Sequence, residues 1–76
     1  MAQNIEKEGG NMTEKDYQVL KEQIIQIQRT GLTNMFDVNM VQRLAFDRGL
    51  FLLVTFLSEG INRKAYANFI LRGAFE

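Results

Sequence analysis

The chain has 76 residues and a mass of 8.8 kDa, which limits it to one small domain, and its 46% hydrophobic and 24% charged residues are typical of a folded protein. It contains no cysteine, histidine, tryptophan or proline, which excludes disulfide scaffolds, zinc fingers, thiol chemistry and any mechanism that needs imidazole. Nine basic residues balance nine acidic ones, and this neutrality disfavours a dedicated nucleic-acid-binding protein, which needs a surplus of positive charge.

Residues 1–12 are predicted to form a flexible tail, because an isolated Ile5 is followed by alternating charges and the Gly9-Gly10 pair. No secretory signal and no run of ~18 apolar residues, as a membrane span requires, is present, so we expect a cytoplasmic protein without a membrane contact. Residues 13–76 are predicted to form a single helical domain. In a domain this small, the free energy gained by burying apolar surface barely exceeds the cost of ordering the chain. We therefore also expect self-association, with a homodimer as the simplest form.

The first helix is predicted over Glu14–Thr30, with Thr13 as its N-cap and acidic residues in its first turn, where they suit the helix dipole. Gly31 follows at the position where a left-handed glycine commonly ends a helix. The apolar residues of this segment recur at helical spacing and form one face: Tyr17, Leu20, Ile24 and Ile27.

A second helix is predicted over residues 38–48, capped by Asp37 and ended by Gly49. Phe36 and Val41 fit a hydrophobic staple, in which apolar residues on either side of an N-cap pack together. The same pairing is predicted around two other caps, Met12 with Tyr17 around Thr13 and Ile61 with Tyr66 around Asn62. The predicted buried face of the second helix carries Val38, Val41, Leu44 and Ala45.

Residues 50–57 are apolar everywhere except at Thr55, and a run of this length fits a buried strand as well as a buried helix. We predict a helix, because the sequence offers no second strand to pair with it. A helix that is apolar on all sides must be enclosed. This segment is therefore expected either to be the central element of the domain or to be covered on one face by another chain.

A last helix is predicted from Asn62 to a stop at Gly73, with Phe75 folding back onto the domain. Its apolar face carries Ala65, Tyr66, Phe69 and Ile70. The predicted fold is all-α, a small domain of four short helices in an orthogonal or bundle-like arrangement.

The polar residues form no recognisable catalytic pattern. Ser58 is the only serine, and a nucleophilic triad cannot be assembled without histidine or cysteine. Asp37, Asp47 and Glu59 are the candidates for carboxylate chemistry, but a helix cap and solvated charges explain them better. Asp37 also begins a pattern that resembles a calcium loop, yet Val41 and the absence of the required glycine break it. We therefore predict no enzyme activity, no cofactor and no metal site.

The spacing of Ala45 and Gly49, with an apolar residue after the glycine, is that of a helix-turn-helix corner. In DNA-binding proteins the next helix presents polar side chains to the base edges. Here the segment from Gly49 to Ser58 contains no arginine, lysine, asparagine or glutamine. A corner that serves helix packing is favoured, and a small helix-turn-helix-like DNA-binding regulator remains the alternative.

The aromatic and methionine side chains exceed what so small a core readily encloses, and such a surplus is typical of interface cores. They are Phe46, Phe51, Phe56, Phe69, Phe75, Met35 and Met40. Filling the core remains an equally weighted alternative. From Arg29 onward six basic residues outnumber four acidic ones, but a solvated face with ion pairs explains this better than a functional patch.

Several short blocks lie at distinctive places in the chain. Residues 34–39 read N-M-F-D-V-N, residues 41–45 read V-Q-R-L-A, and residues 66–73 fit Y-x-x-F-I-x-x-G. Together with the R-x-G at residues 29–31, these blocks resemble a family of short proteins of unknown function encoded by phages and prophages of Gram-positive bacteria. The resemblance covers roughly residues 19–73. Related sequences are more polar where this chain has residues 52–56, which favours an interface at that segment.

The resemblance carries no established activity, but it implies an accessory factor in the bacterial host cytoplasm that binds and modulates one host or phage protein, host-defence proteins included. We therefore predict a protein-binding module whose partner is another protein. Its predicted contact surface combines the third helix with neighbouring basic residues: Phe51, Phe56, Arg48, Arg63 and Lys64.

Overall fold

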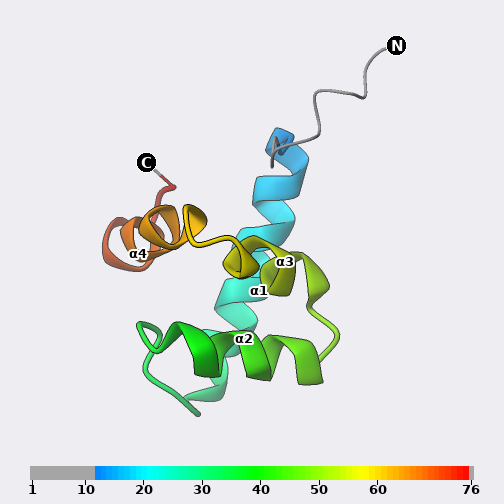
Figure 1. Cartoon of the computed structure of the whole chain (residues 1–76), viewed down its shortest axis with the longest axis vertical. Helices are drawn as coiled ribbons and strands as arrows, with labels where there is room; N and C mark the ends of the chain where they lie inside the picture. Colours follow the sequence, from blue (N-terminus) through cyan, green and yellow to red (C-terminus); the bar gives the residue numbers. More distant parts are fainter. Residues whose placement is uncertain (1–11, 76) are drawn as a thin grey trace.

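The computed structural model describes residues 12–75, which form four α-helices joined by short connections (Figure 1). They are α1 (Glu14–Thr30), α2 (Val38–Asp47), α3 (Phe51–Ser58) and α4 (Asn62–Arg72). The predicted all-α domain of four short helices is confirmed, and α2 lies across α1 rather than alongside it. Met12 is partly buried against the core, whereas the rest of the predicted tail lies outside the described residues.

Helix α1 has the predicted bounds and both predicted caps. The Thr13 hydroxyl accepts a hydrogen bond from the Asp16 N–H (3.1 Å), and the Asp16 carboxylate accepts one from the Thr13 N–H (3.1 Å). This reciprocal capping box satisfies two N–H groups that the helix itself leaves unpaired. Gly31 ends the helix with a φ of 65°, a left-handed conformation that glycine adopts without strain.

Helix α2 ends one residue earlier than predicted, with Arg48 as its C-cap. Asp37 caps it as predicted, because its carboxylate accepts a hydrogen bond from the Met40 N–H (3.2 Å). At the other end, Gly49 has a φ of 74°, and the Leu50 N–H donates to the Ala45 carbonyl (2.8 Å). These features form a Schellman motif, which turns the chain directly from α2 into α3.

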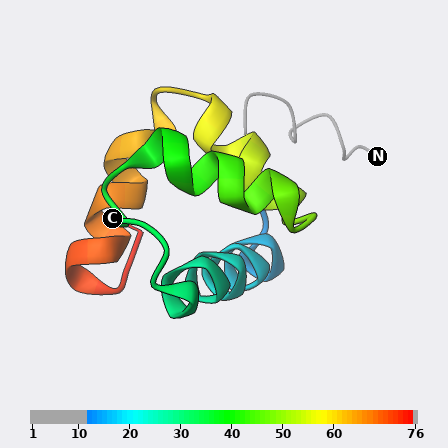
Figure 2. The ribbon, with the colours of Figure 1, turned by 90° about the horizontal axis from the view of Figure 1, so that it is seen from below.

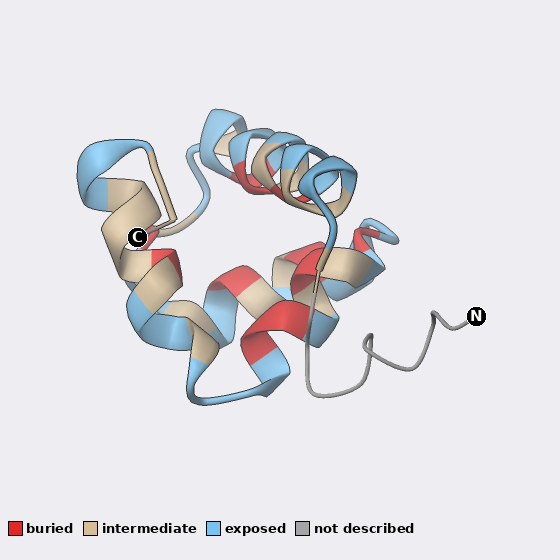
Figure 3. Cartoon of the chain, turned by 90° about the horizontal axis from the view of Figure 1, so that it is seen from above, coloured by how far each residue is buried: buried red, intermediate tan, exposed pale blue. Residues whose placement is uncertain are grey.

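Helix α3 is the central element, since it contacts α1, α2 and α4. Figure 2, seen from below, shows α2 lying over α3. This confirms the helical prediction for the apolar run and shows that the described chain itself encloses most of it. Figure 3 shows the buried positions gathered where the helices face one another. Along α3 the buried side chains are Leu53, Phe56 and Leu57, and the exposed ones are Phe51, Thr55 and Ser58.

Residues from other elements cap both ends of α3. The Gln23 side chain, on α1, accepts a hydrogen bond from the Leu53 N–H (2.9 Å). At the C-terminal end, the Asn62 amide donates to the Phe56 carbonyl (3.0 Å) and the Arg63 guanidinium donates to the Leu57 carbonyl (3.3 Å). Side chains from other elements therefore satisfy backbone groups that α3 leaves without an intrahelical partner.

The start of α4 differs from the prediction. Asn62 does not act as an N-cap, because its side chain is bonded to α3 instead. Ile61 is 83% exposed whereas Tyr66 is fully buried, so the predicted staple between them is wrong. Gly73 ends α4 as predicted, with a φ of 82°.

An aromatic cluster and a buried hydrogen bond also hold α4 against the rest of the domain. The ring of Phe75 folds back as predicted and meets the rings of Tyr17, Phe56 and Phe69, with centroid distances of 5.4, 5.7 and 4.7 Å. The buried Tyr66 hydroxyl donates a hydrogen bond to the Met35 carbonyl (2.6 Å), in the connection between α1 and α2. Burial raises the pKa of Tyr66 to about 12.

Candidate functional site

Two phenylalanine rings project into solvent at the corner where α2 meets α3. Phe46 is 62% exposed and Phe51 is 56% exposed, and their rings meet edge to face with centroids 5.8 Å apart. The left-handed Gly49 brings the last turn of α2 beside the first turn of α3 and so creates this contact. Arg48 is exposed within the turn. We call Phe46, Arg48 and Phe51 the corner surface.

A shallow hollow lies beside the corner surface, between the outer side of α2 and α3. Its lining consists of Asn39, Gln42, Arg43, Phe46, Asp47 and Val54. The Gln42 amide donates hydrogen bonds to the Val54 carbonyl (3.1 Å) and to the Ser58 hydroxyl (2.9 Å), and that hydroxyl donates to the Val54 carbonyl (2.8 Å). These bonds tie α2 to α3 and hold the base of the hollow in one arrangement.

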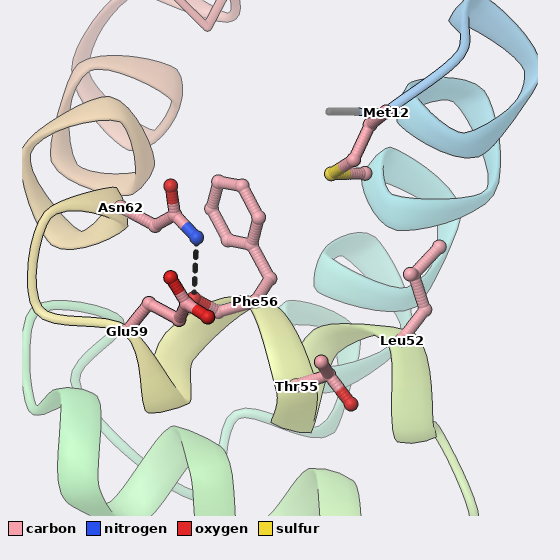
Figure 4. Close-up of a pocket in the computed structure, with 6 residues that line it drawn as sticks. All are labelled: Met12, Leu52, Thr55, Phe56, Glu59 and Asn62. Atoms are coloured by element: carbon pink, nitrogen blue, oxygen red, sulfur yellow. Dashed lines mark hydrogen bonds between the residues drawn. The ribbon is translucent and has the colours of Figure 1, made fainter. Parts of the chain in front are cut away.

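A second, smaller cavity of about 90 Å³ lies on the side of α3 that faces the start of α1 (Figure 4). Its lining is mostly apolar and consists of Met12, Leu52, Thr55, Phe56, Glu59 and Asn62. In Figure 4 the Asn62 amide points to the Phe56 carbonyl, so this polar group already has a partner. Glu59 is the single titratable residue of the lining, so the cavity provides no acid–base pair.

The structure divides the predicted contact residues into separate groups. Phe51 and Arg48 lie together at the corner, whereas Arg63 and Lys64 lie in the first turn of α4, beyond the other end of α3. Phe56 is only 5% exposed and packs on Phe75, so its ring belongs to the core and does not line the surface. Although Arg63 is exposed, its guanidinium already caps α3 through the Leu57 carbonyl.

Phe46 belongs to the corner, although the predicted contact surface omits it. A signal for it exists in the sequence, because Phe46 directly follows Ala45, whose face is buried, and so falls on the polar side of α2. An apolar ring on the polar side of a helix indicates a contact with another helix or with another molecule.

The predicted carboxylate candidates do not come together. Asp37 caps α2, and Asp47 and Glu59 are exposed on different elements. Within residues 12–75, no three acidic side chains are close enough to hold a metal ion. No helix in the same range has the length and apolar character that crossing a membrane requires.

The corner between α2 and α3 has the tight turn that a helix-turn-helix requires, but α3 lacks the side chains of a reading helix. Its exposed residues are Phe51, Thr55 and Ser58, none of which is charged. The nearby Arg43 and Arg48 belong to α2 and the turn. DNA binding through this corner therefore stays a prediction.

No curated protein and no solved structure matches this chain. A family match does cover residues 12–74, which is nearly all of the described part of the chain. The match agrees with the resemblance to a family without an assigned activity, and it spans all four helices. The chain therefore belongs to the family described as a domain of unknown function (DUF5049).

Proposed function

We propose that this chain is a small, non-enzymatic accessory protein of a phage or prophage that acts by binding another protein. The observation that carries the proposal is the exposed pair Phe46 and Phe51 at the corner surface. The assignment to a phage or prophage of Gram-positive bacteria is supported by the resemblance in residues 34–39 and in the blocks around them. The bound protein belongs to the host or to the phage, and host-defence proteins are one such class.

Aromatic rings that remain in water leave hydrophobic stabilisation unused, and a partner that covers them gains it. Phenylalanine and arginine are also enriched at the centres of protein interfaces. Here the Schellman turn around Gly49 holds Phe46, Arg48 and Phe51 in one arrangement. A surface that is already ordered loses little conformational entropy on binding, which favours affinity.

Capture from a host lysate tests the proposal. The tagged full chain is incubated with lysate, with and without nuclease, and captured proteins are identified by mass spectrometry. We expect one protein to be captured in both conditions. Phe51→Ser should reduce this capture by roughly tenfold, the effect of losing one well-packed interface anchor.

The matched control is Phe36→Ser, since Phe36 is 50% exposed but lies in the connection between α1 and α2. It should retain wild-type capture, and circular dichroism should show equal helicity for both variants. Equal capture by the Phe51→Ser and wild-type chains would contradict the proposal. Recovery that disappears with nuclease would support the helix-turn-helix-like regulator instead.

A further inference from the structure

The outer side of α2 presents five exposed residues that no other described element covers. We call this set the α2 face, and it consists of Asn39, Met40, Arg43, Phe46 and Asp47. It includes Phe46 of the corner surface and borders the hollow between α2 and α3. We propose that the α2 face binds a second copy of this chain, with the two α2 helices antiparallel about a twofold axis. This inference goes beyond the proposed binding of another protein: the two surfaces share Phe46, whereas Arg48 and Phe51 lie outside the α2 face.

The charges of the α2 face complement one another when the face meets its own copy. Arg43 and Asp47 lie one helical turn apart, and neither forms an ion pair within residues 12–75. If the twofold axis passes between them, Arg43 lies opposite the partner's Asp47, and the reverse contact follows by symmetry. A parallel arrangement would instead place like charges opposite each other, which disfavours it.

The shape of the α2 face is complementary to itself in the same sense. The exposed ring of Phe46 protrudes beside a hollow that it helps to line, and the bonds from Gln42 to α3 hold the base of that hollow. A twofold contact requires that one surface carry both members of every pair, protrusion with hollow and acid with base. An unrelated partner needs only one member of each pair. The presence of both on a single face favours a second copy.

Sedimentation of the full chain over a concentration series tests this arrangement. The wild-type chain is expected to show a monomer–dimer equilibrium. Arg43→Glu and Asp47→Arg should each raise the dimer dissociation constant by about tenfold or more, since each places two like-charged pairs across the twofold axis. Lys64→Glu is the matched control, because Lys64 is exposed on α4 and away from the α2 face.

Mixing the two charge-reversed chains gives the sharper result. In the mixed pair, the acid introduced by R43E faces the base introduced by D47R, and the unchanged Asp47 of one chain faces the unchanged Arg43 of the other. Mixing should therefore restore dimer formation to near the wild-type level. Circular dichroism checks that each variant retains its helicity.

A wild-type chain that stays monomeric at every concentration overturns the inference, as does a dimer that neither substitution weakens or that mixing fails to restore. These outcomes are distinguishable from failure of the proposed function, because capture of another protein is tested through Phe51 and dimer formation through Arg43 and Asp47.

Discussion

Tyr66 shows how a single polar atom ties distant parts of this chain together. Its ring is fully buried, and its hydroxyl donates a short hydrogen bond to the Met35 carbonyl. A buried hydroxyl without a partner would destabilise the fold, so this bond makes the burial of the whole side chain possible. It joins α4 to the connection between α1 and α2, which is 31 residues away along the chain.

Replacing Tyr66 with phenylalanine tests this bond. Tyr66→Phe should lower the free energy of unfolding by about 1–2 kcal/mol, because it leaves the Met35 carbonyl without its partner. Urea unfolding at neutral pH measures the difference. Tyr17→Phe is the control, since Tyr17 is only partly buried and should show a smaller change. Equal stability of the Tyr66→Phe and wild-type chains would contradict the structural role of the hydroxyl.

The same residue predicts a pH dependence. Burial raises the pKa of Tyr66 from 10.0 to about 12, so ionisation occurs more readily in the unfolded chain. The contribution of the protonated Tyr66 to the free energy of unfolding is therefore fully present below pH 10 and is lost as the pH rises through about 12. We expect the free energy of unfolding of the wild-type chain, measured with urea, to fall with rising pH over this window more steeply than that of Tyr66→Phe. Parallel pH profiles would show that Tyr66 does not titrate in this way.

Helix α3 is a helix that its own sequence supports poorly. It has eight residues, no side-chain cap at its N-terminus and almost uniform apolar character. Helices of this length are not stable alone, because nucleation costs more than so few hydrogen bonds return. Here Gln23 supplies the missing N-terminal acceptor, and Asn62 and Arg63 satisfy carbonyls at the other end.

Removing the cap from α1 tests this dependence. Gln23→Ala should lower the free energy of unfolding by about 1 kcal/mol, because the Leu53 N–H loses its acceptor. Gln26→Ala is a matched control, since Gln26 lies on the same helix but is exposed. Chemical denaturation of both variants gives the comparison. A loss of equal size in both would point to a general effect of shortening a glutamine on α1.

The core of the domain is organised around α3, and α4 packs on α3 and is bonded to it through Asn62 and Arg63. Helix α3 contacts all three other helices, and α1 also contacts α2. Helix α4 reaches α1 largely through the ring of Phe75, which lies among Tyr17, Phe56 and Phe69. The C-terminal segment thereby closes one end of the domain.

Truncating Phe75 should loosen α4 from the rest of the domain. We expect Phe75→Ala to lower the free energy of unfolding by about 2 kcal/mol, less than for a fully buried ring, because Phe75 is only partly buried. The substitution should also increase the rate of amide hydrogen exchange more in α4 than in α1. Leu71→Ala on the exposed side of α4 is the control and should change stability little. Unchanged exchange in α4 would show that Phe75 does not hold it.

Most of the helix boundaries could be predicted from short-range patterns in the sequence. Thr13 and Asp37 act on N–H groups three residues away, and Gly31, Gly49 and Gly73 end helices through their own left-handed conformation. Such interactions join residues close in the chain, so their patterns can be recognised without the fold. The exception is Asn62, a cap-forming residue type whose side chain serves α3 instead.

The burial pattern of α3 and the residues on the surface depend on how the helices pack together. Phe51 and Phe56 belong to the same apolar run, yet one is exposed at the corner and the other is buried against Phe75. The run has no helical periodicity, so it carries no local signal for which side faces the core. That choice, like the cap from Gln23 thirty residues away, depends on how four separate helices pack together. Short-range patterns determine where helices begin and end, and packing between distant segments determines which of their side chains a partner can reach.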